Sequence, residues 1–508
     1  MKHSKSTVTK MLATVLLSSS VLALTSCSGA ADSANGAYSN SGNFYAGSST
    51  DLSTKGESYT EIVENAFVST EEENTSYFSI DANTASYPNL RSLLQNGYDI
   101  PKDAVRVEEM LNYFSYDYET PTDGSVFSLT SSVFDTPYNS ETKLLTIGLA
   151  AQEVKFSETK NNLVFLIDTS GSMFSADKLQ LVQTAFMMLA ENLNHDDRVS
   201  IVTYAGSYTV ELRGAYVYEK QKIMAVIEDL EAGGSTAGSN GIETAYAIAK
   251  ECFIKGGNNR VILATDGDFN VGITSVSKLE AFIAEKRDTG VYFSVFGVGR
   301  GNLQSETMEA LALSGNGTYS YIDSPKEARR ALVEQIGGSM ITVAKDVKAG
   351  VIFNTEYVES FRLIGYENKL LTEEEFNDEN TDAGEIGSGH TVTVVYEIVL
   401  KDKELSADEN LAQVTIKYKP TENTDSDGAE KSLLLDIKGT AYHSERSATD
   451  AFVSSVVEFA LILRDSEYKK DADLNALITR LDELDLSEDE FKAEFRDLVK
   501  QYRNKSEG

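Results

Sequence analysis

Polar side chains follow a predicted buried strand near the middle of this 508-residue chain. The apolar run at residues 163–167 leads directly into Asp168, Ser170 and Ser172, in the pattern Asp-x-Ser-x-Ser. Carboxylate and hydroxyl oxygens in this position could ligate a hard divalent cation. The chain has four His and two Cys, too few to make a zinc or copper centre easy to assemble, so we expect any bound metal to be held by oxygen atoms.

Two further polar clusters lie at the ends of predicted strands. One is the sequence Gly-Gly-Ser-Thr that ends at Thr236 and opens a helix, and the other is Asp266, directly after the strand predicted at residues 261–265. A single Ser, Thr or Asp in such a place is commonly a helix cap or a turn former. Three such clusters, each at the end of a predicted strand, are harder to explain as caps and turns alone. In doubly wound folds the carboxyl ends of the strands are where ligands bind.

The elements that position these clusters alternate between strand and helix from residue 162 to about residue 340. The predicted strands are continuous apolar runs, as expected of parallel strands covered on both faces: residues 163–167, 199–204, 261–265, 292–298 and 319–322. One intervening helix places Leu179, Val182 and Phe186 on a single face. This alternation predicts a doubly wound, Rossmann-like α/β domain.

The order and spacing of the three clusters resemble the metal-ion-dependent adhesion site (MIDAS) of the von Willebrand factor A (VWA) fold. The resemblance implies that Ser170 and Ser172 ligate the ion directly and that Asp168 acts through water. It also implies that Thr236 and Asp266 exchange direct for water-mediated contact when a ligand binds. The implied cofactor is Mg²⁺, with Mn²⁺ or Ca²⁺ as alternatives.

The five implied ligands leave one coordination position of the metal ion for a ligand from another protein. Mg²⁺ takes six oxygen ligands, and three hydroxyls with two carboxylates leave one position open or filled by water. Because the hydroxyls are neutral, the ion stays electrophilic. We therefore expect a protein partner that presents an Asp or Glu carboxylate to the metal.

Strand-like alternation also occurs on both sides of the α/β domain. The predicted flanking strands are residues 126–134 and 144–150 before it, and 351–353, 357–363, 391–400, 411–418 and 433–437 after it. We expect the two sets to form one split β-sandwich, with the α/β domain inserted between them. Helical patterns are predicted between residues 59 and 121 and again from residue 447 to about residue 502.

The N-terminus has the pattern of an export signal. Lys2, Lys5 and Lys10 precede an apolar run at residues 11–24 that is too short for a permanent membrane span. The sequence Leu-Thr-Ser-Cys that ends at Cys27 resembles the lipobox of bacterial lipoproteins, which implies that Cys27 carries a lipid. We therefore expect a lipid-anchored protein at the cell membrane, facing outside the cytoplasm.

These observations predict six segments along the chain. They are a lipoprotein signal peptide (1–26), a flexible tether (27–58), an N-terminal helical module with β segments (59–160), a VWA domain (161–340), a β-rich domain (341–445) and C-terminal helices (446–508). Stretches at residues 78–81, 103–114 and 457–466 resemble the flanking modules of bacterial cell-envelope VWA lipoproteins. Members of that family have no well-established activity, so this resemblance implies architecture more than function.

The charge balance and missing motifs exclude several function classes. With 79 acidic and 45 basic residues, the net charge is -34, which repels nucleic acid. Without residues 1–26, which contain three Lys and no acidic residue, it becomes -37. The loop Gly297-Val298-Gly299-Arg300-Gly301 departs from the dinucleotide-binding pattern, and a phosphate-binding Gly-Lys-Ser/Thr loop is also missing, so no nucleotide is expected. His195, His390 and His443 each fit a surface position better than a catalytic one.

Two hypotheses follow for the function, and neither requires an enzyme. The first is an anchored, extracytoplasmic VWA protein that binds a protein partner through its metal. The alternative is a structural or assembly factor of the cell envelope, in which the VWA domain is a metal-independent scaffold.

Overall fold

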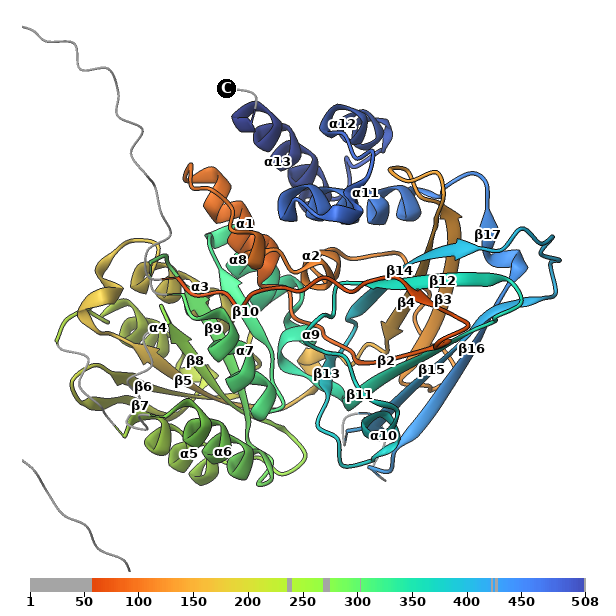
Figure 1. Cartoon of the computed structure of the whole chain (residues 1–508). Coiled ribbons are helices and arrows are strands. Elements are labelled where there is room, and N and C mark those ends of the chain that lie inside the picture. The colour runs from red at the N-terminus through yellow and green to blue at the C-terminus, as the bar shows by residue number, and fades with distance from the viewer. Residues whose placement is uncertain are drawn as a thin grey trace, which may run out of the picture. The chain divides into compact units, whose positions relative to one another are not determined.

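The computed structural model describes residues 57–234, 240–267, 275–301, 303–421, 424 and 428–506, all within one structural unit, Leu52–Gly508 (Figure 1). The predicted signal peptide, most of the tether, Cys27 and Thr236 lie outside the described residues. Within the described part, no helix is both long and apolar enough to cross a membrane.

A six-stranded sheet lies at the centre of the α/β domain, in the order β10-β9-β8-β5-β6-β7. Its strands are β5 (Asn161–Asp168), β6 (Arg198–Tyr204), β7 (Tyr208–Tyr216), β8 (Asn258–Thr265), β9 (Tyr292–Val298) and β10 (Tyr319–Ile322). The five predicted strands are all present and run parallel. The sixth, β7, pairs antiparallel with β6 at the sheet edge and was not predicted, because few of its residues are buried and they form no apolar run.

Helices cover both faces of this sheet (Figure 1). Alternate residues of β5 face opposite cores: Phe165 packs with α3 on one face, whereas Val164 packs with α5 on the other. This alternation explains why residues 163–167 of β5 are all apolar. The first face carries α3 (Leu179–Asn192), α4 (Lys220–Glu228) and α8 (Pro325–Arg329), and the second carries α5 (Gly241–Glu251), α6 (Val276–Arg287) and α7 (Ser305–Ser314). The doubly wound α/β fold is confirmed.

The chain from Pro325 to Met340 forms three consecutive helical segments. The helix α8 runs into a π-helical turn, Arg330–Glu334, and α9 (Ile336–Met340) follows it. The wide turn is closed by the bond from Gln335 N to Arg330 O at 2.8 Å.

Two flanking sheets enclose one hydrophobic core and form the expected sandwich. One has the order β1-β12-β14-β4-β3-β17, made by β1 (Val68–Ser69), β12 (Val358–Ile364), β14 (Thr391–Leu400), β4 (Lys143–Ala151), β3 (Phe127–Asp135) and β17 (Tyr442–His443). The other contains β13 (Gly384–Gly387), β11 (Thr342–Phe353), β15 (Asn410–Pro420) and β16 (Lys431–Lys438), with β2 (Thr75–Ser79) paired to β11. Because β4 pairs antiparallel with β14, strands from both sides of the α/β domain share a sheet, as expected.

The N-terminal and C-terminal helices form a single helical layer with one core (Figure 1). Its members are α1 (Ser86–Gln95), α2 (Val107–Asn112), α11 (Ala448–Arg464), α12 (Leu474–Glu483) and α13 (Glu490–Ser506). The ring of Phe114 contacts both Phe452 of α11 and Phe495 of α13. Shorter helical turns occur at α10 (Glu373–Asn377), Lys102–Ala104, Phe156–Glu158, Gly171–Phe174, Val217–Glu219, Gly439–Ala441 and Glu467–Lys469.

Candidate metal centre at the carboxyl edge of the central sheet

Asp168 is the last residue of β5, the strand between β6 and β8, and is fully buried. Its Oδ1 accepts a hydrogen bond from Ser170 N at 2.8 Å. Its Oδ2 lies 3.3 Å from Thr265 Oγ1 and 3.4 Å from Tyr204 Oη, which both donate to it. The carboxylate is therefore held between the ends of three adjacent strands.

This environment disfavours an unpaired negative charge. Burial raises the pKa of Asp168 to about 6, and the nearby Asp266 carboxylate acts in the same direction. A cation bound beside Asp168 would oppose both effects, because it stabilises the ionised carboxylate.

The two serine hydroxyls lie side by side after β5. Ser170 is fully buried and Ser172 is half-buried, and their Oγ atoms are 2.9 Å apart. Ser170 has extended backbone, and the helical turn Gly171–Phe174 begins directly after it. Burial of Met173 anchors this turn to the domain core, so both hydroxyls stay near Asp168.

Asp266 follows β8, the neighbour of β5, and is 1 % exposed. Its Oδ2 accepts a hydrogen bond from Lys178 Nζ at 2.7 Å. The sheet thus brings Asp168, Ser170, Ser172 and Asp266 to one edge, although the sequence separates the first and last by almost a hundred residues.

The segment that leads to Thr236 reaches the same edge. Gly233 N donates to Thr169 O at 2.8 Å, and a Cβ atom added to Gly171 would lie 3.4 Å from Gly234 O. The last described residues before Thr236 therefore contact the loop that carries Ser170 and Ser172.

Three known protein families match different parts of the chain. Residues 162–335 match the family described as "von Willebrand factor type A domain". Residues 338–504 match "Uncharacterized protein YfbK, C-terminal", and residues 53–146 match a family described as "von Willebrand factor". Residues 162–335 therefore form a VWA domain, and the part of the chain after it is similar to the C-terminal domain of YfbK.

The VWA protein has similar curated relatives. "Uncharacterized protein YfbK" of Escherichia coli is 43% identical over 339 residues, which cover 65% of this chain and 59% of the relative. "Uncharacterized protein sll0103" of Synechocystis is 30% identical over 170 residues, or 33% of this chain and 39% of that protein. This chain therefore spans less than two thirds of the length of either relative. Among solved structures, "von Willebrand factor type A from Catenulispora acidiphila" is 16% identical, with a TM-score of 0.39, over 66% of this chain and 78% of that one.

VWA domains commonly bind a divalent metal, and the oxygen donors at this edge fit such an ion chemically. Two buried carboxylates and two adjacent hydroxyls could provide hard oxygen ligands. Lys178 was not anticipated there, because nothing in its position before α3 indicates that its side chain reaches Asp266.

The N-terminal segment covers another part of the same edge. The Glu57 carboxylate accepts hydrogen bonds from Arg300 Nη2 at 2.7 and 2.8 Å and from Gly301 N at 3.2 Å. The glycine-rich loop after β9 therefore binds a carboxylate of the chain itself.

A second acidic cluster joins the VWA domain to its flanks. Ligand atoms of Asp81, Glu109 and Glu309 lie within 4.8 Å of one another, and all three residues are buried. Lys369 Nζ hydrogen-bonds Glu309 and lies 3.6 Å from Asp81 Oδ2. Because this lysine already supplies a positive charge, we interpret the cluster as a structural contact rather than a metal site.

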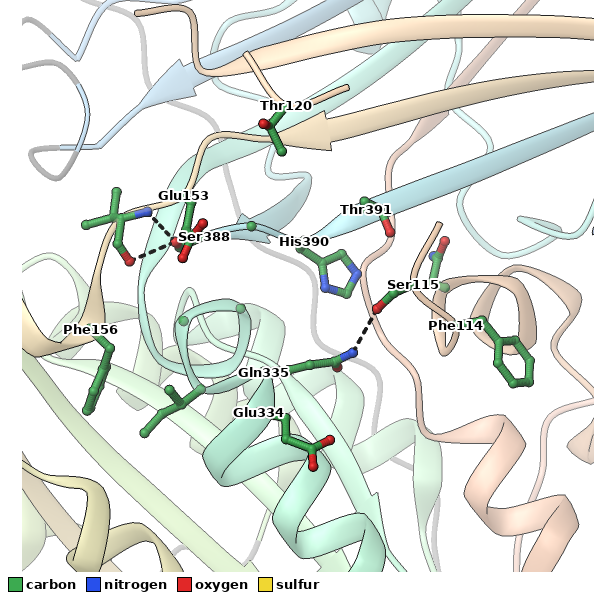
Figure 2. Close-up of a pocket in the computed structure, with 16 residues that line it drawn as sticks. Phe114, Ser115, Thr120, Glu153, Phe156, Glu334, Gln335, Ser388, His390 and Thr391 are labelled. Atoms are coloured by element: carbon green, nitrogen blue, oxygen red, sulfur yellow. Dashed lines mark hydrogen bonds between the residues drawn. The ribbon is translucent and has the colours of Figure 1, made fainter. Parts of the chain in front are cut away.

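A cavity of about 360 Å³ lies where the sandwich, the helical layer and the end of the VWA domain meet (Figure 2). Figure 2 shows Gln335 bonded to Ser115 across it, and the His390 ring in its wall. Burial lowers the pKa of His390 to about 4, which differs from the expected surface position. None of Asp168, Ser170, Ser172 or Asp266 lines this cavity.

Proposed function

We propose that this VWA protein binds a protein partner through a divalent cation held by Asp168, Ser170, Ser172, Thr236 and Asp266. The observation that carries the proposal is the meeting of the buried Asp168 and Asp266 carboxylates with the Ser170 and Ser172 hydroxyls at one sheet edge. The preferred ion is Mg²⁺, with Mn²⁺ or Ca²⁺ as alternatives, since all the ligands are oxygen atoms.

When bound, the ion would accept an Asp or Glu carboxylate from the partner. The chain's own residues would orient the site: Thr265 and Tyr204 hold the Asp168 carboxylate, and the helical turn presents Ser172 toward solvent. The role is binding, so it requires no catalytic residue.

An aromatic side chain beside the site supports a protein partner. Phe174 lies two residues after Ser172 and is 81% exposed. Aromatic residues are enriched at protein interfaces, where they contribute large contact areas. A partner that presents a carboxylate to the metal could therefore cover Phe174 with an adjacent apolar side chain.

We also propose that the protein is anchored through a lipid on Cys27 and faces outside the cytoplasm. The lipobox-like sequence before Cys27 supports this proposal. A Cys27→Ala variant should move from the membrane fraction to the soluble fraction; if it stays with the membranes, the lipid anchor is wrong.

One observation favours the alternative, a metal-independent envelope scaffold. Arg91 of α1 is 2% exposed and pairs with Asp323 and Glu327 of the VWA domain and with Glu494 of α13, at 2.6 to 2.9 Å. These contacts fix the VWA domain to the helical layer, which a scaffold would need.

Capture of partners with and without a chelator separates the two functions. The wild-type chain, an Asp168→Asn variant and the matched control Asp177→Asn would be immobilised and exposed to a detergent extract of the cell envelope. Asp177 is an exposed carboxylate on the same loop. Metal-dependent binding predicts that EDTA and Asp168→Asn each release a partner that Asp177→Asn retains. Retention of the same partner in EDTA would favour the scaffold.

A further inference from the structure

Lys178 places a buried ammonium group at the candidate metal centre. Its side chain is 9% exposed, and its Nζ lies 2.7 Å from the Asp266 carboxylate, which is completely buried. A lysine is rarely buried without a charged partner, because removing an ammonium group from water costs free energy. Asp266 is therefore paired with a cation that belongs to the chain.

The path of the Lys178 side chain is built into the fold. Gly299, in the loop after β9, has φ +68, and a Cβ atom there would lie 2.3 Å from Lys178 Cγ and 2.5 Å from Lys178 Cε. The aliphatic part of the lysine thus lies directly against a backbone that only glycine can provide. Tyr321 Oη donates to Gly299 O at 2.9 Å and holds that loop in place.

Lys178 is also close in sequence to the proposed metal ligands. It directly precedes α3, where its N donates to Ser175 O at 3.0 Å. The segment from Asp168 to Lys178 therefore begins with three of the proposed ligands and ends with the Lys178 ammonium group.

A divalent ion and the Lys178 ammonium need the same carboxylate. Two positive charges a few ångströms apart in a buried site repel each other strongly. Binding of the ion must therefore either move Lys178 away from Asp266 or occur against this repulsion. Both routes weaken the affinity for the ion.

We infer that Lys178 is an internal competitor that sets the concentration of divalent cation at which the site fills. This inference rests on the proposed metal-dependent function. In the ion-free protein Lys178 neutralises Asp266, and an ion that fills the site must either open this ion pair or bind against the repulsion of the Lys178 ammonium group.

The test measures Mn²⁺ binding to the full chain by isothermal titration calorimetry. The variants are Lys178→Met, which removes the charge, Lys178→Gln, which keeps a hydrogen-bond donor, and Lys155→Met as control. Lys155 is 68% exposed and pairs with the exposed Glu158, so the Lys155→Met control changes the net charge by the same amount as Lys178→Met. Circular dichroism checks that each variant is folded, and Lys178→Gln replaces Lys178→Met if the latter does not fold.

We expect removal of the Lys178 charge to tighten Mn²⁺ binding about ten-fold or more, with no change for Lys155→Met. Unchanged or weaker binding in the Lys178 variants would overturn the inference while leaving the metal site intact. If neither the wild type nor any Lys178 variant binds Mn²⁺, the proposed function fails as well.

Discussion

Arg91 of α1 forms a bidentate salt bridge with Asp323, the residue after β10, and bonds both of its carboxylate oxygens. Arg91 Nε donates to Asp323 Oδ2 at 2.8 Å and Nη2 donates to Oδ1 at 2.6 Å, with both side chains buried. Glu327 and Glu494 complete the network around the same guanidinium group. The VWA domain is thus joined to its helical flanks by a buried ionic contact at the sheet edge.

Replacing Arg91 should destabilise the whole chain. An Arg91→Leu variant leaves buried carboxylates without their cation, so we expect the free energy of unfolding to fall by about 3–5 kcal/mol in urea titrations. Arg329→Leu is a matched control, because Arg329 also joins the VWA domain to α13, through an exposed pair with Glu490. Its loss should cost less than about 1 kcal/mol. If both variants lose the same free energy of unfolding, burial of the Arg91 network adds nothing to the stability of the protein.

His390 should make the protein less stable in mild acid. Its pKa in the folded state is about 4, below the ordinary value of about 6.5 expected in the unfolded chain. Between these values the unfolded state binds more protons, so stability is complete above pH 6.5 and is lost as the pH falls toward 4. Between pH 7.5 and pH 5 the loss should be about 2 kcal/mol.

The variant His390→Gln should remove that part of the pH dependence. Chemical unfolding at pH 7.5 and pH 5 measures it, with His195→Gln as control because His195 is exposed. A wild-type-like pH dependence in His390→Gln would mean that another group is responsible.

Phe174 should contribute to partner binding without affecting the ion. Truncation by Phe174→Ala removes an exposed aromatic ring, so we expect the affinity for a captured partner to fall about ten-fold. The affinity for Mn²⁺ should stay unchanged, since Phe174 offers no ligand atom. Surface plasmon resonance and calorimetry measure the two affinities. Parallel loss of both would instead indicate that the variant distorts the Ser170–Ser172 turn.

The fold could be predicted largely from local sequence patterns. Continuous apolar runs identified the parallel strands, and the Asp-x-Ser-x-Ser pattern after β5 located the candidate site. The edge strand β7 escaped prediction because its exposed residues carry no apolar pattern. The π-helical turn Arg330–Glu334 also escaped, since a helical pattern does not distinguish a wide turn from a regular one.

Features that depend on distant parts of the chain could not be read from the sequence. The approach of Lys178 to Asp266 requires the loop at Gly299, more than a hundred residues away. The contact between Arg91 and Asp323 similarly joins two modules that the sequence presents as separate. The neighbours of His390 in the sequence are typical of a surface loop, whereas packing around the cavity leaves this residue half-buried, with its Nε2 atom shielded from solvent.

Calorimetric titration of the full chain with Mg²⁺ tests the central claim most directly. We predict that the wild type and Asp177→Asn each bind one ion per chain and that Asp168→Asn loses this binding. Asp168 lies within the site, whereas Asp177 is an exposed carboxylate nearby. Equal binding by Asp168→Asn and the wild type, or no binding by any of the three proteins, would contradict it.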